Sequence, residues 1–191
     1  MKNRKFIIAF LLIITSITSV SAAEYKIDTD GMHASVNFKI SHLGTSWLVG
    51  RFDKFEGTYS YDAEKPNESS VQMTVETSSV NTNHAERNSH IRAENLLNTD
   101  NFPIATFVSD SVVFEDDING IVKGKLKLHG VEKDVSMNIK KIGEGKDPWG
   151  GYRTGFEGIM TLRMADFGIT RNLSKASETL ELTVMLEGIR Q

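Results

Sequence analysis

The 191-residue chain contains no cysteine, and this absence excludes several kinds of chemistry at once. Disulfide bonds, thiol catalysis, iron–sulfur clusters and cysteine-ligated zinc sites all require that residue. The acylated N-terminal cysteine of a bacterial lipoprotein is excluded as well. The domain must therefore be held together by packing, which a chain of this length permits through one substantial core.

Long apolar runs are also missing, apart from one at the N-terminus. Residues 6–14 are almost entirely apolar but too few to span a bilayer comfortably. Lys2, Arg4 and Lys5 precede this run, and small or short side chains at Val20, Ser21 and Ala22 follow it, as at a signal-peptidase site. We interpret residues 1–22 as a cleaved secretory signal and residues 23–191 as the mature domain. We expect the bacterial periplasm as its location.

Positive charge is in the minority. The whole chain has 22 Lys and Arg against 25 Asp and Glu, a net charge of −3. The predicted leader contains three of the basic residues and no acidic one, so the mature domain has 19 against 25, a net charge of −6. Binding to a phosphate backbone needs a basic surface. We therefore expect no nucleic-acid partner.

The remainder of the chain reads mainly as β-strand, because apolar and polar residues alternate in segment after segment. The clearest segment has Val122, Leu126 and Leu128 on one face and lysines on the other. A phase slip near Asp53 and Lys54 predicts a bulge in the second segment. Asn119-Gly120 predicts a hairpin turn, and residues 143–151 a glycine-rich loop. The predicted strands are residues 32–40, 47–61, 71–75, 104–114, 122–128, 135–139, 152–164 and 180–186.

Residues 81–97, between the third and fourth strands, are the exception. Asn83 followed by Glu86 resembles a capping box and predicts the start of a helix. Ile91 is the one large apolar residue on its candidate inner face, so this helix must dock on the β-structure. It is suited to a lid or rim; the alternative is a solvated helix with one anchoring residue.

Eight strands with mostly short connections favour an antiparallel sheet. Nearly every strand has an apolar face that needs covering, and one helix cannot cover them all. The sheet must therefore close on itself or fold into a sandwich. We favour an all-β, eight-stranded antiparallel barrel with one helix between strands 3 and 4, because closure also removes exposed strand edges.

Catalytic signatures are lacking. The sequence has no G-x-S-x-G, no H-E-x-x-H and no phosphate-binding glycine loop. His84 and His90 are six residues apart and lie on different faces of a helix, so they do not form a pair of metal ligands. A metal site that the fold assembles from His33, His42 or His129 stays open as an alternative. We expect no enzyme activity, no metal and no cofactor.

A binding function agrees better with the pattern, since an eight-stranded barrel can hold one small ligand. Gly50, Gly57, Gly124 and Gly158 lie on inward faces and either leave volume there or relieve strain at bends. The candidate apolar lining is Val36, Phe38, Ile40, Phe52, Phe55, Val75, Phe107, Leu126, Leu128, Phe156, Leu182 and Val184. The candidate rim or head-group residues are Arg87, His90, Arg92, Trp47, Trp149 and Arg153.

Six collinear motifs give these features a family context. They are residues 33–38, 42–44, 82–92, 102–107, 126–131 and 147–156. Through them, and across essentially the whole mature domain, the sequence resembles the YceI-like family of periplasmic polyisoprenoid-binding proteins.

The resemblance implies a lipocalin-like barrel with a helix at its side or mouth. It also implies a long isoprenoid lipid or a prenylated quinone in the interior, for a carrier or a store that contacts membranes transiently. The alternative is a stress-response or protein-interaction module whose barrel is packed and holds no ligand. Neither the head group nor the oligomeric state follows from the sequence.

Overall fold

The computed structural model describes residues 22–171 and 174–191. The predicted leader, apart from Ala22, lies outside this part of the chain. Within the described residues, no helix is both long enough and apolar enough to cross a bilayer.

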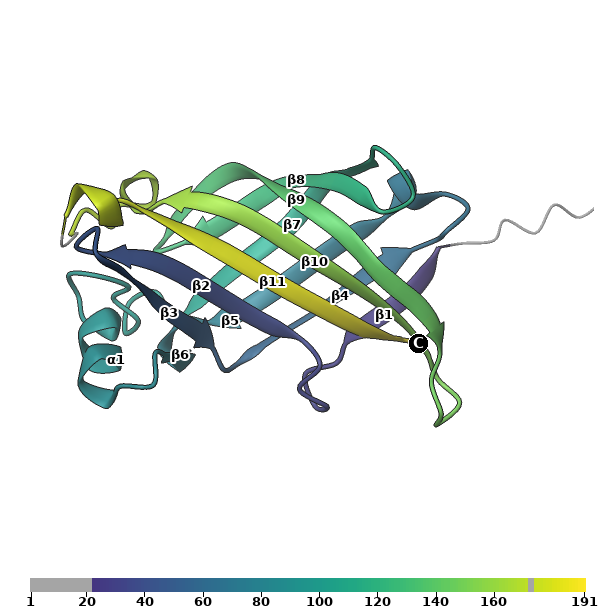
Figure 1. Ribbon diagram of the computed structural model, residues 1–191, viewed down its shortest axis with the longest axis horizontal. Helices are drawn as coiled ribbons and strands as arrows, with labels where there is room; N and C mark the ends of the chain where they lie inside the picture. The colour runs from purple at the N-terminus through teal and green to yellow at the C-terminus, as the bar shows by residue number, and fades with distance from the viewer. Residues whose placement is uncertain (1–21, 172–173) are drawn as a thin grey trace, which may run out of the picture.

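An 11-stranded antiparallel sheet closes into an elongated barrel (Figure 1). The pairs β1 and β2, β3 and β4, and β5 and β6 are each halves of one bent strand, so the barrel has eight long strands in simple up-and-down order. The strands are β1 Ala23–Ile27, β2 Ser35–His42, β3 Ser46–Phe52, β4 Phe55–Tyr61, β5 Ser70–Glu76, β6 Val80–Asn81, β7 Ile104–Phe114, β8 Asn119–Leu128, β9 Val131–Lys146, β10 Tyr152–Arg163 and β11 Thr179–Arg190; α1 is Ala85–Arg92.

Strand β11 closes the barrel by pairing with both halves of the first long strand. Its first part pairs with β2, from Leu180 opposite Ile40 to Met185 opposite Ser35. Its last part pairs with β1, from Gly188 opposite Ile27 to Arg190 opposite Tyr25. This confirms the predicted barrel and excludes the sandwich. The half-strand β1 lies outside the predicted strand boundaries.

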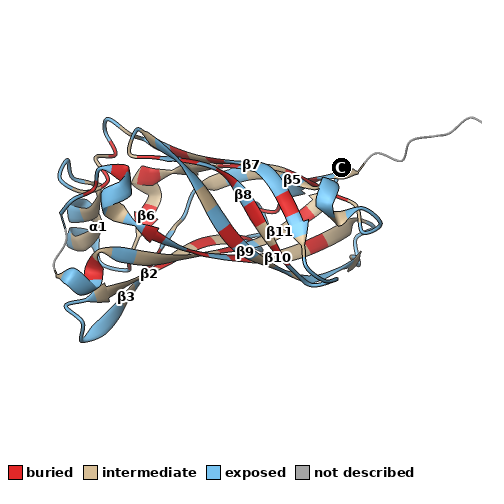
Figure 2. Cartoon of the chain, turned by 90° about the horizontal axis from the view of Figure 1, so that it is seen from above, coloured by how far each residue is buried: buried red, intermediate tan, exposed pale blue. Residues whose placement is uncertain are grey.

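The inward and outward alternation follows the sequence closely. In β8 every second residue from Gly120 to Leu128 is buried, while Lys123, Lys125 and Lys127 point to solvent. Figure 2 shows a similar alternation of buried and more exposed positions along parts of β7 and β10, and mostly exposed turns at both ends. The apolar faces therefore enclose the interior, as the period of two requires.

Some local boundaries differ from the prediction. The interruption between β3 and β4 falls at Asp53 and Lys54, as predicted. Asn119-Gly120, however, begins β8, and the turn lies before it, where Asp116 Oδ1 accepts hydrogen bonds from the backbone N–H groups of Ile118 (2.8 Å) and Asn119 (2.6 Å). Strand β9 also continues to Lys146, through much of the predicted glycine loop.

Helix α1 is shorter than predicted and has a different cap. Asn83 adopts a left-handed conformation with φ of 60°, so it precedes the cap. His84 takes that position, and its Nδ1 accepts a hydrogen bond from the Arg87 backbone N–H (3.2 Å). No residue of the helix is fully buried, which is why α1 depends on neighbouring segments for its position.

The inward glycines do not leave empty space, which corrects that interpretation. A Cβ atom at Gly124 would collide with the Val108 carbonyl oxygen and the Phe107 ring. One at Gly158 would collide with the sulfur of Met137, and one at Gly50 with the ring of Phe38. These positions are glycine because a neighbouring strand or side chain already fills the space.

Candidate functional site: an internal cavity with a polar mouth

The barrel contains a cavity of about 600 Å³, which we call the outer chamber. Its wall comes from the inward residues of β2, β3, β5, β7, β8, β10 and β11, and α1 lies over one side of it. The volume lies within the usual range for small-molecule sites, roughly 300–1,000 Å³.

A second space of about 100 Å³, the inner chamber, lies deeper in the barrel. The two chambers have five wall residues in common, and we call this set the neck. All five are apolar: Val36, Val75, Ala105, Leu126 and Leu182. The interior is therefore an elongated apolar space from the α1 end toward the middle of the barrel.

The ionisable groups of the lining lie at the outer chamber's end near α1, which we call the mouth. His42, His84, Glu86, His90 and Arg171 line the cavity and are exposed, so the cavity reaches the surface there. Arg87 and Arg171 outnumber the single carboxylate of the mouth, that of Glu86. The cavity thus combines an apolar depth with polar and cationic groups at its opening.

Helix α1 forms one side of the mouth and is fixed there by hydrogen bonds rather than by burial. Arg87 donates from Nε to Thr82 Oγ1 (2.8 Å) and from Nη2 to the Thr82 carbonyl oxygen (2.6 Å). Asn88 Oδ1 accepts from the Thr82 backbone N–H (2.8 Å) and hydroxyl (2.7 Å). Ile91 adds the apolar contact with the core that the sequence predicted.

The opposite end, which we call the closed end, is filled by aromatic rings. Tyr25 stacks on Tyr59 with ring centroids 5.0 Å apart. Phe156 meets Tyr59 at 5.7 Å and Tyr61 at 5.2 Å, both edge to face, and Phe114 packs beside them. The Tyr59 hydroxyl donates to the Thr154 carbonyl oxygen (2.9 Å), and burial raises its pKa. We call these five rings the aromatic plug.

The structure places most of the predicted apolar residues on this interior. The outer chamber is lined by Val36, Phe38, Ile40, Phe52, Val75, Leu126, Leu128 and Leu182. The inner chamber adds Phe107, Phe156 and Val184. Phe55 lines neither chamber and packs against the core instead. Their contact with a ligand stays a prediction.

The predicted rim residues separate into two groups. Arg87 and His90 line the mouth, whereas Arg92 does not. Trp47, 65% exposed, lies on β3 beside the mouth, with Lys39 Nζ 5.1 Å from its ring centre. Trp149 and Arg153 lie in the β9–β10 turn and at the start of β10, at the end opposite α1 (Figure 1). This corrects the prediction that those two belong to the rim.

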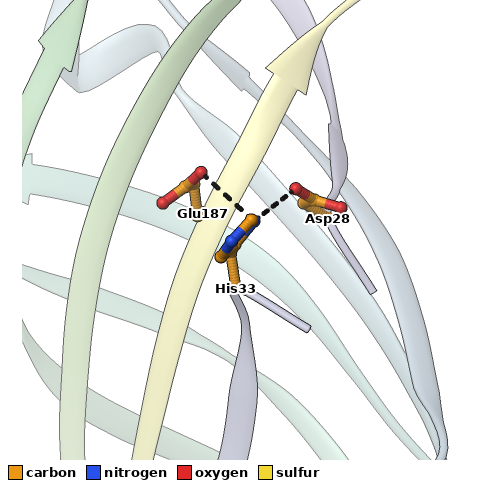
Figure 3. Close-up of side chains that lie close together, drawn as sticks. All are labelled: Asp28, His33 and Glu187. Carbon is orange, nitrogen blue, oxygen red and sulfur yellow. Dashed lines mark hydrogen bonds and ion pairs between the residues drawn. The ribbon is translucent and has the colours of Figure 1, made fainter. Parts of the chain in front are cut away.

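Arg153 instead ties several segments together at the closed end. Its Nη1 donates to Asp28 Oδ2 (2.6 Å) and Glu187 Oε1 (2.7 Å), and its Nε donates to Asp147 Oδ2 (2.8 Å). His33 Nδ1 also donates to Asp28 Oδ2 (2.9 Å), and Figure 3 shows the imidazole between the two carboxylates of Asp28 and Glu187. We call these five residues the ionic cluster.

Hydrogen bonds within the ionic cluster shift the pKa values of three of its members, Asp28, Asp147 and Arg153. Hydrogen bonds from His33 and then Arg153 lower the pKa of Asp28 to about 2 from an ordinary 3.8. The hydrogen bond from Arg153 also lowers the pKa of Asp147. The pKa of Arg153 is raised above its usual value by Asp28 first, then by Asp147 and Glu187. The Arg153 guanidinium is thus the common hydrogen-bond donor to the carboxylates of Asp28, Asp147 and Glu187.

The same cluster is the one group of possible metal ligands among the described residues. Ligand atoms of Asp28, His33 and Glu187 lie within 4.8 Å of one another. Arg153 Nη1 already donates to both of the carboxylates, so a positive charge takes the place that a cation would need. We therefore assign the cluster a structural role.

Sequence reasoning missed part of the lining. Leu48, Leu162 and Leu180 lie on strands at inward positions, and alternation alone would have found them. Leu96, Leu97 and Ile169 come from connecting segments and line the cavity only because those segments fold back over the mouth. No local pattern in the sequence predicts that arrangement.

A closed antiparallel barrel with an internal apolar cavity is thus the class to which this molecule belongs. A family model described as the YceI-like domain matches residues 25–188. The chain is 55% identical over 170 residues to a UPF0312 protein of Ectopseudomonas mendocina, covering 89% of each chain. It is 51% identical over 175 residues to a UPF0312 protein of Shewanella oneidensis, covering 91% of each. The chain belongs to the YceI-like family.

Solved structures show the same fold. Burkholderia cenocepacia BcnA matches with a TM-score of 0.74 at 20% identity, covering 84% of this chain and 98% of that one. A structure described as a polyisoprenoid binding domain from Saccharophagus degradans matches with a TM-score of 0.63 at 20% identity, covering 89% and 99%. At these identities the likeness concerns the fold alone.

Proposed function

We propose that this protein binds a long-chain isoprenoid lipid or a prenylated quinone inside its barrel, as a carrier or store. The observation that carries the proposal is the cavity of about 600 Å³ with apolar walls and a polar mouth. The polyisoprenoid binding domain of Saccharophagus degradans, which has the same fold, adds support for the ligand class.

The volume suits such a chain. A cavity of about 150 Å³ accommodates benzene, so a proportionate estimate for about 600 Å³ is roughly 24 carbon atoms, or about five isoprene units. At about 0.8 kcal/mol per buried CH₂, each five-carbon unit contributes on the order of 4 kcal/mol gross. Several units thus offset the ordering costs of binding, estimated at roughly 4–15 kcal/mol.

The mouth suits the head group. Arg87, Arg171 and the mouth histidines offer hydrogen-bond donors, which complement the oxygens of a quinone or of a polar lipid head. A ligand of this kind resides in membranes, so we infer a transient contact between the mouth and a bilayer. We further propose that this takes place in the periplasm, after removal of residues 1–22.

The competing function, an interaction module with a packed barrel, predicts an interior without space. The outer and inner chambers, which share five wall residues, favour binding over that alternative. We propose a binding role rather than a catalytic one, because the depth of the cavity carries apolar side chains and its ionisable groups are confined to the mouth.

The test is recovery of the ligand. Protein purified from cells is extracted with organic solvent and analysed by mass spectrometry, and delipidated protein is then offered a prenylated quinone. Leu48→Arg places a charge in the cavity wall, whereas the neighbouring Val49→Arg lies on the outer face, where Val49 is 62% exposed. We expect Leu48→Arg to lose the ligand and Val49→Arg to retain it. No prenyl lipid in repeated extractions, with no uptake of added quinone, would refute the proposal.

A further inference from the structure

The inner chamber ends at one side chain of the aromatic plug. Of the five rings, all within the described chain, Phe156 is the one that lines the inner chamber. Tyr59, Tyr61 and Phe114 contact Phe156 from behind, with ring centroids 5.7, 5.2 and 6.5 Å away. Phe156 therefore forms the floor of the space that is reached from the mouth.

The floor is rigidly supported. Phe156 pairs with Leu186 on β11 and with Lys141 on β9, at the point where the β9–β10 register shifts. Behind it, the Tyr59 hydroxyl is bonded to the backbone of Thr154, which is 1% exposed. A chain that reaches this ring meets packed aromatic surface, and burying more of the chain would require displacing the plug.

The passage above the floor runs through the neck, where the two chambers share their wall residues. The neck is apolar throughout, and the smallest of its side chains is that of Ala105. Nothing in the neck itself distinguishes a short apolar chain from a longer one of the same width. The limit on chain length therefore lies at Phe156.

We propose that Phe156 sets the length of isoprenoid chain that this protein can bury completely. This inference rests on the proposed function and deepens it, since it defines which members of the ligand class fit. The two chambers measure about 600 and about 100 Å³. Scaled from a cavity of about 150 Å³ that accommodates the six carbon atoms of benzene, they hold roughly 28 carbon atoms, or between about five and six isoprene units. Affinity rises with each added unit up to that length, and further units stay outside the mouth and add nothing.

The test compares chain-length profiles. Delipidated protein is equilibrated with an equimolar series of quinones that share one head group and differ in the number of isoprene units, supplied in phosphatidylcholine vesicles. Bound members are quantified by mass spectrometry. Phe156→Ala removes six carbon atoms from the floor, which makes room for about one further unit. We expect the affinity for the first chain beyond the wild-type limit to rise about tenfold, which corresponds to 1.4 kcal/mol.

Two variants make the result specific. Phe38→Ala removes the same ring from the side wall of the outer chamber, so it widens the cavity and leaves the preferred length unchanged. Ala105→Phe fills the neck and shifts the preference to shorter chains. Circular dichroism verifies the fold of each variant, and Phe156→Leu, with a smaller shift in the same direction, replaces Phe156→Ala if that variant does not fold.

The outcomes separate the two proposals. A longer preferred chain in Phe156→Ala, with an unchanged one in Phe38→Ala, supports the inference. Identical profiles for the wild-type protein and a folded Phe156→Ala or Phe156→Leu variant overturn it while leaving the isoprenoid function intact. A wild-type protein that takes up no member of the series overturns both.

Discussion

The two ends of the barrel are built from the same kind of strand but are closed in opposite ways. At the closed end, five aromatic rings fill the interior and Arg153 ties three carboxylates from separate segments. At the mouth, an eight-residue helix without a fully buried residue lies beside an apolar cavity. The difference teaches that the stabilising contacts and the proposed binding site lie at different ends, so each can be perturbed separately.

The largest expected effect is at the closed end. Arg153→Ala leaves Asp28, whose side chain is 5% exposed, with one of its two side-chain partners removed. Removing one member of a buried ion pair is strongly destabilising, and we expect the free energy of unfolding to fall by about 3 kcal/mol. Denaturation with urea measures this.

Arg51→Ala is the control for that variant. Arg51 makes an exposed ion pair with Asp53 near the mouth end, so its loss should change the free energy of unfolding by less than about 1 kcal/mol. An equal fall in the free energy of unfolding in the two variants would show that the ionic cluster stabilises the fold no more than an exposed ion pair does.

The second effect is the pH dependence of the closed end. The pKa of Asp28 is about 2 in the folded protein, below the ordinary 3.8, so its ionised form stabilises the fold. That contribution, about 2 kcal/mol, is present above the unfolded-state pKa and is lost as the pH falls from about 5 to about 2.

Unfolding free energies of the wild-type protein and Asp28→Asn across this range test the assignment. The difference between the two proteins should be largest near neutral pH and shrink toward zero at the acid end. A difference that stays constant with pH would contradict the role given to the Asp28 carboxylate.

A smaller effect is expected at the mouth. Ile91→Asp removes the apolar contact between α1 and the core, which should speed ligand dissociation about tenfold while changing the stability of the barrel little. Ser89→Asp introduces the same charge at an exposed position of the helix and is the control. Stopped-flow exchange of a bound quinone measures both. An unchanged rate of quinone exchange in Ile91→Asp would show that α1 only packs against the barrel and does not control ligand release.

The smallest expected effect is a change in the fluorescence of the two tryptophans, which lie at opposite ends of the barrel. Trp47 is 65% exposed beside the mouth, and Trp149 is 79% exposed at the closed end. If the mouth meets the membrane, vesicles with a brominated lipid should quench the fluorescence of the Trp149→Phe variant, where Trp47 remains. The Trp47→Phe variant should stay unquenched. Stronger quenching of Trp149 would place the contact at the wrong end.

The fold was predictable because alternation is a local property. In a strand, apolar residues at every second position mark the buried face, as β8 illustrates. Closure of the sheet then follows from the need to cover eight apolar faces. The positions of Trp149 and Arg153 were also accessible: in an up-and-down barrel, successive turns alternate between the ends. Counting turns from the helix would have placed the start of β10 opposite α1.

Other features depend on contacts that no local pattern contains. The glycines at 124 and 158 are explained by a neighbouring strand and by Met137, both distant in the sequence. The helix cap moved from Asn83 to His84 because an asparagine tolerates a left-handed backbone as readily as it caps. In the ionic cluster, a hydrogen bond joins Asp28 and Arg153, which are 125 positions apart along the chain.

The interruptions in the first three long strands also have a mechanical consequence. The interruption between β3 and β4 lies next to that between β5 and β6, because the Asp53 N–H donates to the Ser79 carbonyl oxygen (3.1 Å) and the Glu76 N–H donates to the Lys54 carbonyl oxygen (3.0 Å). Both lie beside the break between β1 and β2. Together they form a seam across the wall, with the panel of β2, β3 and β6 on the side of α1. Because the ladder is already broken along this seam, we expect this panel, rather than the plugged half, to yield when the opening has to widen.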